Sequence, residues 1–477
     1  MTAQPIDPVQ PTNHLETVFK KQRLAFEQER YPGAATRIDR LKLIKDALLK
    51  NRARIIDALN EDFGTRPAEV TRLAEIGGST GNLDYCASHV KRWMKPQSRG
   101  VSMWFMPGKN QVMPQPKGVV GIVAPWNYPI NLAVAPLAAA LAAGNRAMIK
   151  MSEFTPASAA LLKEILAELF DEDLVAVFDG GPDEAAQFTR LAFDHLLFTG
   201  STGVGKKVMA AAAENLTPVT LELGGKSPVV IDEDFDLTEA ANRVMWGKTF
   251  NAGQTCVAPD YALVPKGQTG RFVAALDQAY FKHFPQGASD DNYTSVIDQR
   301  NYDRLRDLVE GARAAGAEIH EIEQTTNDHV TKRKFPLTLV IDPPADSRIM
   351  SEEIFGPVLP VLEHEGRTQA IDRVNQGDRP LALYYFGKDG ADEVLQQSHS
   401  GGVTTNDVML QYLQADLPFG GTGASGFGAY HGKEGFETFS HMKAVFRQRG
   451  FGSFTGLKML YPPYTGLARR LITMMGG

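Results

Sequence analysis

Two side chains in this sequence have the chemistry to form and release a covalent intermediate: the thiol of Cys256 and the carboxylate of Glu222. Cys256 follows a helical stretch and lies in a glycine-containing loop (FNAGQTC), a setting in which nucleophiles are often presented. The other cysteine, Cys86, lies in an apolar helical stretch and is interpreted as a core residue. The local context of Cys256 does not distinguish between a nucleophile and a structural thiol.

Glu222 stands at the end of a predicted buried strand, just before two glycines. Strand alternation places Leu221 and Leu223 on one face of that strand and Glu222 on the other. Burial would raise the pKa of such a carboxyl group and suit it to act as a general base. A carboxylate that caps a neighbouring helix is the alternative, and the segment taken alone favours that alternative.

Polar side chains follow the first two predicted strands: Asn127 in PWNYP, and Lys150 and Glu153 in KMSE. The carboxyl ends of parallel strands are where open α/β sheets bind ligands. The amide of Asn127 could donate a hydrogen bond to a developing oxyanion. A turn-forming amide is the alternative for Asn127, and an exposed charge at a strand end is the alternative for Lys150.

A run of small residues joins a predicted strand (HLLFT) to a predicted helix (KKVMAAAAENL). Small residues let backbone N–H groups approach a phosphate, and a helix N-terminus attracts negative charge. The spacing is G-x-x-G-x-G rather than the fingerprint G-x-G-x-x-G, so a tight structural turn is an equal alternative. The residues of this turn are Gly200, Ser201, Thr202, Gly203, Val204 and Gly205.

Two further features bear on the chemistry. Glu353 and Phe355 lie in EEIFGP, a segment that could hold a ribose or be a plain loop. A cysteine nucleophile commonly has a histidine partner. His195 and His431 are the nearest candidates by region, and neither has a context that indicates such a role.

Alternating strand and helix patterns are the elements that must position these side chains. From residue 118 buried apolar runs alternate with helical stretches as far as the LELGG segment, and a less regular alternation covers about residues 228–406. Alternation of this kind predicts an α/β fold with parallel sheets and helices on both faces. A short ribbon is predicted before it, with strands SMWFM and QVMPQ joined by a PGKN turn.

Composition limits the classes of protein that fit. The chain has 477 residues, 43% of them hydrophobic, and a net charge of −6, which excludes a mostly disordered chain and gives no reason to expect nucleic acid as a partner. Two cysteines and no visible signal peptide lead us to expect a cytoplasmic protein. The apolar stretch 132–144 is too short to span a membrane, which takes roughly 20 residues.

The C-terminal residues 447–477 carry five basic side chains and no acidic one. A tail packed on the body or on a partner subunit is the preferred interpretation. The alternative is contact with an acidic membrane surface through GLARRLITMM, a short basic amphipathic segment.

Taken together and in this order, six motifs resemble those of the aldehyde dehydrogenase superfamily over about residues 20–447: PWNYP, K-x-x-E, FTGSTGVGK, LELGGKSP, FNAGQTC and EEIFGPV. The glycine spacing of the turn is the one that this family uses. The segments GQTCVAPDY and LPFGGTGASGFGAYHGKEGFETFSH look like the class 3 branch. Among bacterial members they are most similar to the coniferyl aldehyde dehydrogenases.

This resemblance implies a role for each residue singled out above. Cys256 would attack the aldehyde, Asn127 and the Cys256 backbone N–H would stabilise the oxyanion, and Glu222 would activate the water that releases the acid. The implied cofactor is NAD or NADP, the implied substrate is a small-molecule aldehyde, and no metal is implied. The implied cofactor-binding residues are Trp126, Lys150, Glu153, Gly200, Ser201, Thr202, Gly203, Val204, Gly205, Gly224, Glu353 and Phe355.

The resemblance also divides the chain. A Rossmann-like NAD(P)-binding domain would comprise residues 1–101 and 117–222, and an α/β catalytic domain would comprise residues 223–406. A ribbon at 102–116 and a segment at 407–446 would form the contact of a homodimer, and 447–477 would be a basic tail. An open ribbon edge would otherwise be an aggregation hazard.

Two other functions remain to be weighed. One is a cysteine hydrolase or transferase that uses Cys256 without a redox step, and the other is a non-catalytic scaffold on the same fold. Relatives that pass the acyl group to coenzyme A need no base at the position of Glu222, so its presence favours hydrolysis to the free acid. We expect an aromatic or medium-chain aldehyde. The choice between NAD and NADP stays open, although Glu153 would repel a 2′-phosphate.

Overall fold

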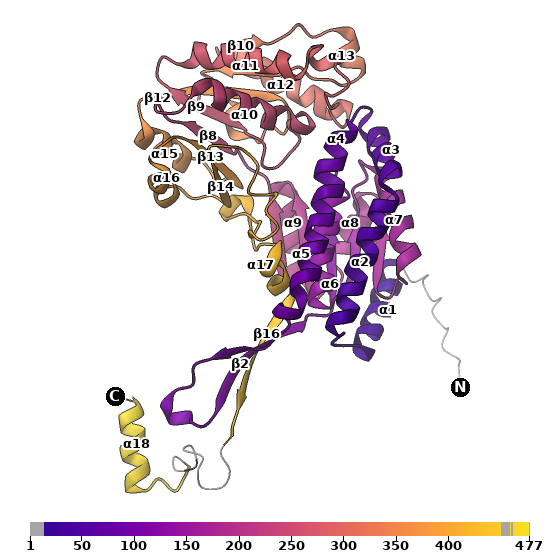
Figure 1. The fold of residues 1–477 in the computed structure, drawn as a ribbon, viewed down its shortest axis with the longest axis vertical. Helices are drawn as coiled ribbons and strands as arrows, with labels where there is room; N and C mark the ends of the chain where they lie inside the picture. The colour runs from indigo at the N-terminus through magenta and orange to yellow at the C-terminus, as the bar shows by residue number, and fades with distance from the viewer. Residues whose placement is uncertain (1–13, 450–457, 459–460, 477) are drawn as a thin grey trace, which may run out of the picture.

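The chain folds into two α/β bodies and a projecting arm (Figure 1). The structure is a computed structural model that describes residues 14–449, 458 and 461–476. The expected loose tail at 1–13 and most of residues 450–460 lie outside the described residues. The α/β class predicted from the alternation of strands and helices is confirmed.

The first body is built on a six-stranded sheet whose five long strands are parallel. These strands are almost wholly buried apolar runs, which is typical of strands covered on both faces. In sheet order the strands are β15 (Gly426–Phe427, antiparallel), β7 (Val219–Leu223), β6 (His195–Gly200), β3 (Val119–Val123), β4 (Arg146–Lys150) and β5 (Val175–Phe178).

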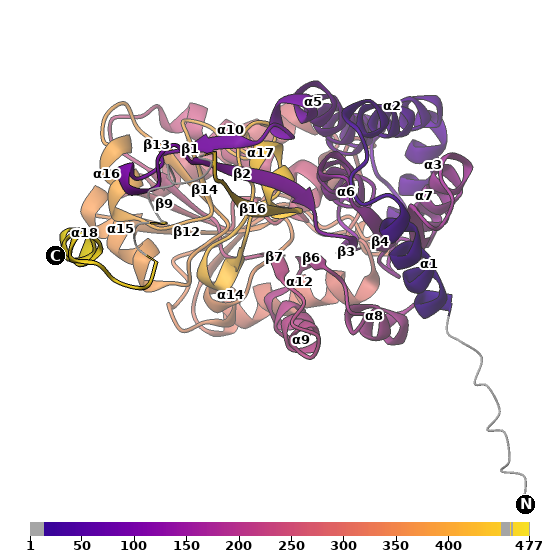
Figure 2. The same ribbon diagram turned by 90° about the horizontal axis from the view of Figure 1, so that it is seen from below.

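Helices cover both faces of this sheet, as the view from below shows (Figure 2). Two hydrophobic clusters, one on each face, hold the layers together. One face carries α2 (Ala34–Lys50), α3 (Arg52–Phe63), α5 (Gly78–Trp93), α6 (Asn131–Ala143) and α7 (Pro156–Leu169). The other face carries α1 (His14–Gln28), α8 (Pro182–Thr189) and α9 (Thr202–Ala213).

The second body is built on a seven-stranded sheet, parallel except for one edge strand. In sheet order its strands are β10 (Glu318–Glu321), β11 (Thr338–Ile341), β12 (Val358–His364), β9 (Tyr261–Pro265), β8 (Pro228–Ile231), β13 (Ala382–Phe386) and β14 (Gly402–Thr405). Its helices are α10 (Leu237–Thr249), α11 (Thr269–His283), α12 (Gln299–Ala314), α13 (Asn327–Thr331), α14 (Arg348–Ser351), α15 (Arg367–Gln376) and α16 (Ala391–Gln397).

Four short elements complete the two bodies and the tail. Between α3 and α5 the chain forms α4 (Ala68–Val70) and then a π-helical segment, η1 (Thr71–Gly77). Helix α17 (Gly432–Thr438) packs against α6 and leads into the arm. The basic amphipathic segment near the C-terminus forms helix α18 (Gly466–Gly476), which lies beside the arm (Figure 1).

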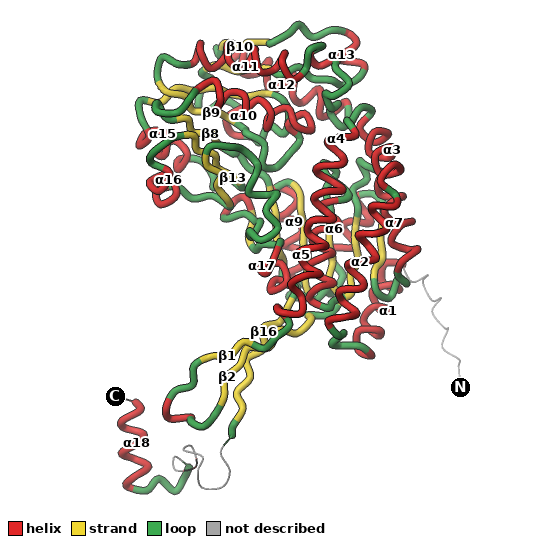
Figure 3. Tube along the Cα trace, viewed as in Figure 1, coloured by secondary structure: helices red, strands yellow, loops and turns green. Residues whose placement is uncertain are grey.

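The arm is a three-stranded antiparallel ribbon that extends away from both bodies (Figure 3). Its strands are β1 (Gln97–Arg99), β2 (Lys109–Pro116) and β16 (Ser440–Arg447), with β2 in the middle. The prediction of a first strand at SMWFM is wrong, because Met103–Phe105 form a 3-10 turn. The turn brings the ring of Phe105 edge-on to that of Phe446, so these apolar side chains fold back over the ribbon and do not extend it.

Candidate active site

The loop that presents Cys256 has an unusual backbone. Helix α10 ends at Thr249, and a 3-10 turn (Phe250–Gly253) follows. Asn251 and Ala252 both have φ of 52°, and Gly253 has φ of 68°. Non-glycine residues seldom occupy this left-handed region, and such strain is concentrated at functional sites. A Cβ on Gly253 would lie 2.6 Å from the carbonyl oxygen of Gly356, so this loop packs directly against the loop that holds Glu353.

Gln254 holds the strained loop in place. Its Nε2 donates to the carbonyl oxygens of Asn251 and Ser295, at 3.0 and 3.1 Å, and its Oε1 accepts from the N–H of Ile297 at 2.9 Å. The side chain is fully buried, so these bonds have no competition from water. The role of Gln254 was not predicted from the sequence, because one glutamine in a loop has no distinctive pattern.

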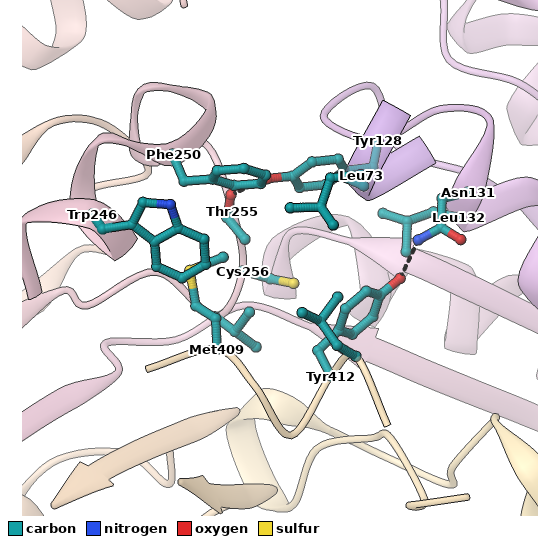
Figure 4. A pocket seen from close by; sticks show the side chains of 13 residues that line it. Leu73, Tyr128, Asn131, Leu132, Trp246, Phe250, Thr255, Cys256, Met409 and Tyr412 are labelled. Atoms are coloured by element: carbon teal, nitrogen blue, oxygen red, sulfur yellow. Dashed lines mark hydrogen bonds between the residues drawn. The ribbon is translucent and has the colours of Figure 1, made fainter. Parts of the chain in front are cut away.

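Cys256 borders two separate cavities. On one side is an apolar pocket, shown in Figure 4 with the sulfur at its centre. Aromatic and aliphatic side chains from both bodies line this pocket, among them Leu73, Tyr128, Leu132, Trp246, Phe250, Met409 and Tyr412. On the other side is a more polar cavity, lined among others by Trp126, Asn127, Thr199, Glu222, Gly224, Arg304, Glu353 and Phe355. The structure therefore brings most of the predicted site residues together around one sulfur atom.

Glu222 is a buried carboxyl group beside Cys256. It is 1% exposed, and neither of its oxygens has a hydrogen-bond partner among the described residues. Burial raises its pKa to about 8, and the nearby side chains of Cys256 and Thr199 offset only part of that rise. Burial, together with the Glu222 and Glu353 carboxylates, also raises the pKa of the Cys256 thiol well above its usual value. Burial thus favours the protonated forms of two neighbouring acidic groups, Cys256 and Glu222.

Asn127 reaches the same cavity from the loop after β3. Its side chain is 3% exposed, and its Nδ2 donates to the carbonyl oxygen of Gln254 at 3.2 Å. The amide is thus aimed at the backbone of the Cys256 loop. Trp126, its neighbour, contacts the ring of Phe355 edge-to-face at 5.3 Å.

A long open groove continues from the polar cavity along the carboxyl ends of β3, β4 and β6. Predicted residues that line it are Trp126, Lys150, Glu153, Gly200, Ser201 and Val204. The Lys150 ammonium group is buried and donates to the carbonyl oxygens of Met151 and Gly180. Desolvation lowers the pKa of this amine. A groove at the carboxyl ends of parallel strands is the kind of site in which α/β sheets bind nucleotides.

Three residues of the predicted glycine turn do not line the groove. The hydroxyl of Thr202 bonds to the carbonyl oxygen of Ala424 at 3.3 Å. A Cβ on Gly205 would lie 2.6 Å from the Leu223 side chain, so this glycine allows α9 to pack closely on β7. A Cβ on Gly203 would meet nothing within 4 Å.

Gly224 and Glu353 fit against one another at the mouth of the polar cavity. A Cβ on Gly224 would lie 1.9 Å from Oε2 of Glu353, so only glycine leaves room for this carboxyl group. Burial raises the pKa of Glu353 to about 8. The guanidinium group of Arg304 donates to the carbonyl oxygen of Ile354 at 2.6 Å, which holds the next residue of this loop. Phe355 has φ of 49°, so this loop, like that of Cys256, contains a non-glycine residue with left-handed backbone.

Neither histidine considered as a partner for the thiol contacts it. His195 lies at the opposite end of β6 from the site, where its ring nitrogens bond to Lys117 and Thr220. Burial lowers the pKa of His431 to about 4, and its ring nitrogens have no hydrogen-bond partner among the described residues. Cys86 is buried in the core, as predicted.

Several residues at the site belong to no motif that the sequence shows. Asn301 and Arg304 come from α12, and Tyr412 comes from the segment after β14. They belong to a charged helix and an irregular loop, neither of which shows a motif. Thr199 lines the polar cavity but was not predicted as a site residue, because its sequence context is that of a buried strand.

The sequence of this chain matches one known protein family over most of its length. The chain matches the aldehyde dehydrogenase family over residues 9–445. It is 48% identical over 465 residues to a probable coniferyl aldehyde dehydrogenase of Pseudomonas aeruginosa, covering 97% of this chain and 96% of that one. It is 45% identical over 420 residues to a coniferyl aldehyde dehydrogenase of a Pseudomonas sp., covering 87% of each chain.

Solved structures agree with the family match. The substrate-bound AldH of Staphylococcus aureus superposes with a TM-score of 0.91 at 35% identity, covering 98% of this chain and all of that one. A betaine aldehyde dehydrogenase of S. aureus in complex with NAD+ has a TM-score of 0.83 at 27% identity, covering 92% and 90%. An NADP-dependent enzyme of E. coli has a TM-score of 0.82 at 25% identity, covering 91% and 90%.

The close fit of Gly224 against Glu353 gives a prediction. We expect Gly224→Ala to weaken NAD+ binding by about tenfold or more, because the new methyl group displaces the Glu353 carboxyl group. The measurement is a titration of intrinsic fluorescence with NAD+. Gly270→Ala, in α11 with nothing within 4 Å of its added Cβ, is the control and should bind as wild type does. Equal affinities of the two variants for NAD+ would contradict the prediction that Gly224 and Glu353 bind the cofactor.

Proposed function

The chain belongs to the aldehyde dehydrogenase family, whose members oxidise aldehydes with NAD(P), and from this premise we propose that Cys256 is its nucleophile and Glu222 its base. The observation that carries the proposal is the position of Cys256 between an apolar pocket and a polar cavity. An aldehyde and a cofactor can approach one sulfur atom from opposite sides. A hydrolase without a redox step would have no use for the second approach.

The groove after β3, β4 and β6 suits the cofactor. Gly224 leaves the space that the Glu353 carboxyl group occupies, and the groove runs from that point along the strand ends. Lys150 and Glu153 would meet the adenosine ribose, and the turn from Gly200 would meet the pyrophosphate. Glu353 and Phe355 would hold the nicotinamide ribose and ring. When bound there, NAD(P) supplies the hydride acceptor.

The remaining chemistry belongs to the chain's own residues. The Cys256 thiol releases its proton to water, and the thiolate attacks the carbonyl carbon of the aldehyde. The oxyanion accepts hydrogen bonds from the Asn127 amide and from the backbone N–H of Cys256. After oxidation the acyl group is held as a thioester on the cysteine. Glu222 then removes a proton from water, which attacks the thioester and releases the acid and the thiol.

The apolar pocket indicates the class of aldehyde. Its walls are aromatic and aliphatic, with few polar groups. Two hydrogen bonds join side chains that line it, one between the Asn131 amide and the Tyr412 hydroxyl (Figure 4) and one between the hydroxyls of Tyr128 and Thr255, both at 2.6 Å. Such a pocket suits a flat or extended apolar substrate. Together with the names of the two Pseudomonas relatives, this favours aromatic aldehydes of the coniferyl type, followed by medium-chain aldehydes.

We also propose that the protein is a cytoplasmic homodimer joined through the ribbon, with the first body binding NAD(P) and the second carrying Cys256. The ribbon exposes apolar side chains, with Met103 at 78%, Met106 at 57% and Phe446 at 49% exposure. Exposed apolar side chains on an open strand edge favour pairing with another chain. None of the helices in the described ranges has both the length and the hydropathy needed to span a membrane.

The dimer can be tested on the purified protein. We expect twice the chain mass by light scattering at micromolar concentration, because a second copy would cover the ribbon. Replacing Phe446 by Glu should lower that mass towards one chain. A monomer in the wild-type sample would contradict the proposal.

The function is tested by a panel of aldehydes, each assayed with NAD and with NADP. We expect absorbance at 340 nm to rise with aromatic aldehydes. Because the pocket is apolar, kcat/KM should be higher for coniferyl-type aldehydes than for short aliphatic aldehydes. Hydrolysis of an ester of the same acids, with no rise in absorbance on any aldehyde, would favour the cysteine hydrolase. No turnover of any aldehyde with either cofactor would favour the non-catalytic scaffold.

Removing the Glu222 carboxylate should separate the two halves of the reaction. Glu222→Gln keeps the shape of the side chain but cannot take a proton from water, so we expect a burst of NADH followed by turnover slowed by about 100-fold or more. The thioester should accumulate on the peptide that contains Cys256, as detected by mass spectrometry. Wild-type turnover without thioester would contradict the role of Glu222.

The pH profile gives a control on the same residue. A base works in its deprotonated form, and burial raises the pKa of Glu222 to about 8. The wild-type kcat should therefore rise with pH and level off above that value, whereas Glu222→Gln should lose this rise.

A further inference from the structure

A buried ion pair lies directly behind the Asn127 loop. Nη2 of Arg66 and Oε1 of Glu75 are 3.0 Å apart, and both side chains are 0% exposed. In every other ion pair among the described residues, at least one side chain is 15% exposed or more. Burying two charges is costly and is weak evidence for stability, so this pair calls for another explanation.

Each partner of the pair holds the backbone of the Asn127 loop. Nη1 of Arg66 donates to the carbonyl oxygen of Asn127 at 3.0 Å. Oε2 of Glu75 accepts from the backbone N–H of Asn131 at 2.7 Å, at the start of helix α6. A carboxylate at a helix N-terminus is favoured by the helix dipole. The two contacts fix the segment at both of its ends, at residues 127 and 131.

The same pair also touches the wall of the apolar pocket. The guanidinium carbon of Arg66 lies 5.1 Å from the ring centroid of Tyr128, which lines the pocket. Glu75 belongs to the π-helical segment η1 (Thr71–Gly77), and its neighbours Leu73 and Ala74 line the pocket as well. π-helical turns are rare and are frequent at functional sites. The ion pair therefore joins two pocket walls to the loop that carries Asn127.

From these contacts we infer that Arg66 and Glu75 are positioning residues, which hold the Asn127 amide where the oxyanion forms and fix Tyr128 in the pocket wall. The inference rests on the proposed function, since it assigns Asn127 to the oxyanion. A rigid charged pair in a dry interior keeps its partners at fixed distances. A displacement of about 1 Å in a catalytic group can lower a rate by about 100-fold.

The test replaces both charges at once, so that neither is left buried and unpaired. We expect Arg66→Met with Glu75→Leu to lower kcat by about 10- to 100-fold while the affinity for NAD+ stays within about twofold, because the pair contacts the loop and not the groove. The assay uses the full-length enzyme with an aldehyde that the wild type oxidises.

A double-mutant cycle distinguishes positioning from a general structural effect. If the pair acts through the Asn127 amide, then in an Asn127→Ala background the same double replacement should lower kcat/KM by less than about threefold. Losses that multiply would show that the pair and Asn127 act independently, and would overturn the inference. Wild-type kcat in the charge-free variant would also overturn it.

Two controls keep the outcome clear. Arg367→Met, which removes an ion pair with Asp232 in the second body, should leave kcat within about twofold of wild type. If the charge-free variant does not fold, Arg66→Lys is used in its place, because it keeps a positive charge but loses the forked donor. The same cycle with Asn127→Ala then decides between positioning and a general structural effect. A wild-type enzyme that oxidises no aldehyde would refute the proposed function, whereas an active wild type with an additive cycle would refute only this inference.

Discussion

Everything at the site depends on one sulfur atom that must be reached from two directions. The chain passes from the first sheet to the second directly after β7, and the Cys256 loop returns from the second body to face the end of that strand. The apolar pocket and the polar cavity consequently meet at Cys256 and share it. Left-handed backbone at Asn251 and Ala252 is the strain that this placement requires, and the buried bonds of Gln254 hold it.

Burial of Glu222 is the second requirement. A carboxyl group in water would be ionised at neutral pH and a weak base. Here burial raises its pKa to about 8, and the absence of hydrogen-bond partners among the described residues leaves both oxygens able to accept a proton from water. The fold thus keeps an uncompensated carboxyl group in its interior, which costs stability but gives a base of suitable strength.

The sequence predicted those parts of the fold and site that follow local rules. Parallel strands end at one edge of a sheet, so the placement of Asn127, Gly200 and Glu222 near one another follows from strand alternation. The parts it did not predict depend on contacts between distant segments. Arg66 meets Asn127 across 61 residues, and Asn131 meets Tyr412 across 281, and neither pair has a spacing that sequence alone could detect. The ribbon strand was misplaced because Phe105 folds back onto Phe446 rather than pairing.

Chemical modification of the two cysteines tests the central claim, that Cys256 is the nucleophile, most directly. The enzyme would be treated with limiting iodoacetamide, and activity and the alkylation of each cysteine-containing peptide would be followed over time. The account predicts that activity falls in proportion to alkylation of Cys256, while Cys86, buried in the core, stays unmodified. Full activity in protein whose Cys256 is completely alkylated would contradict it.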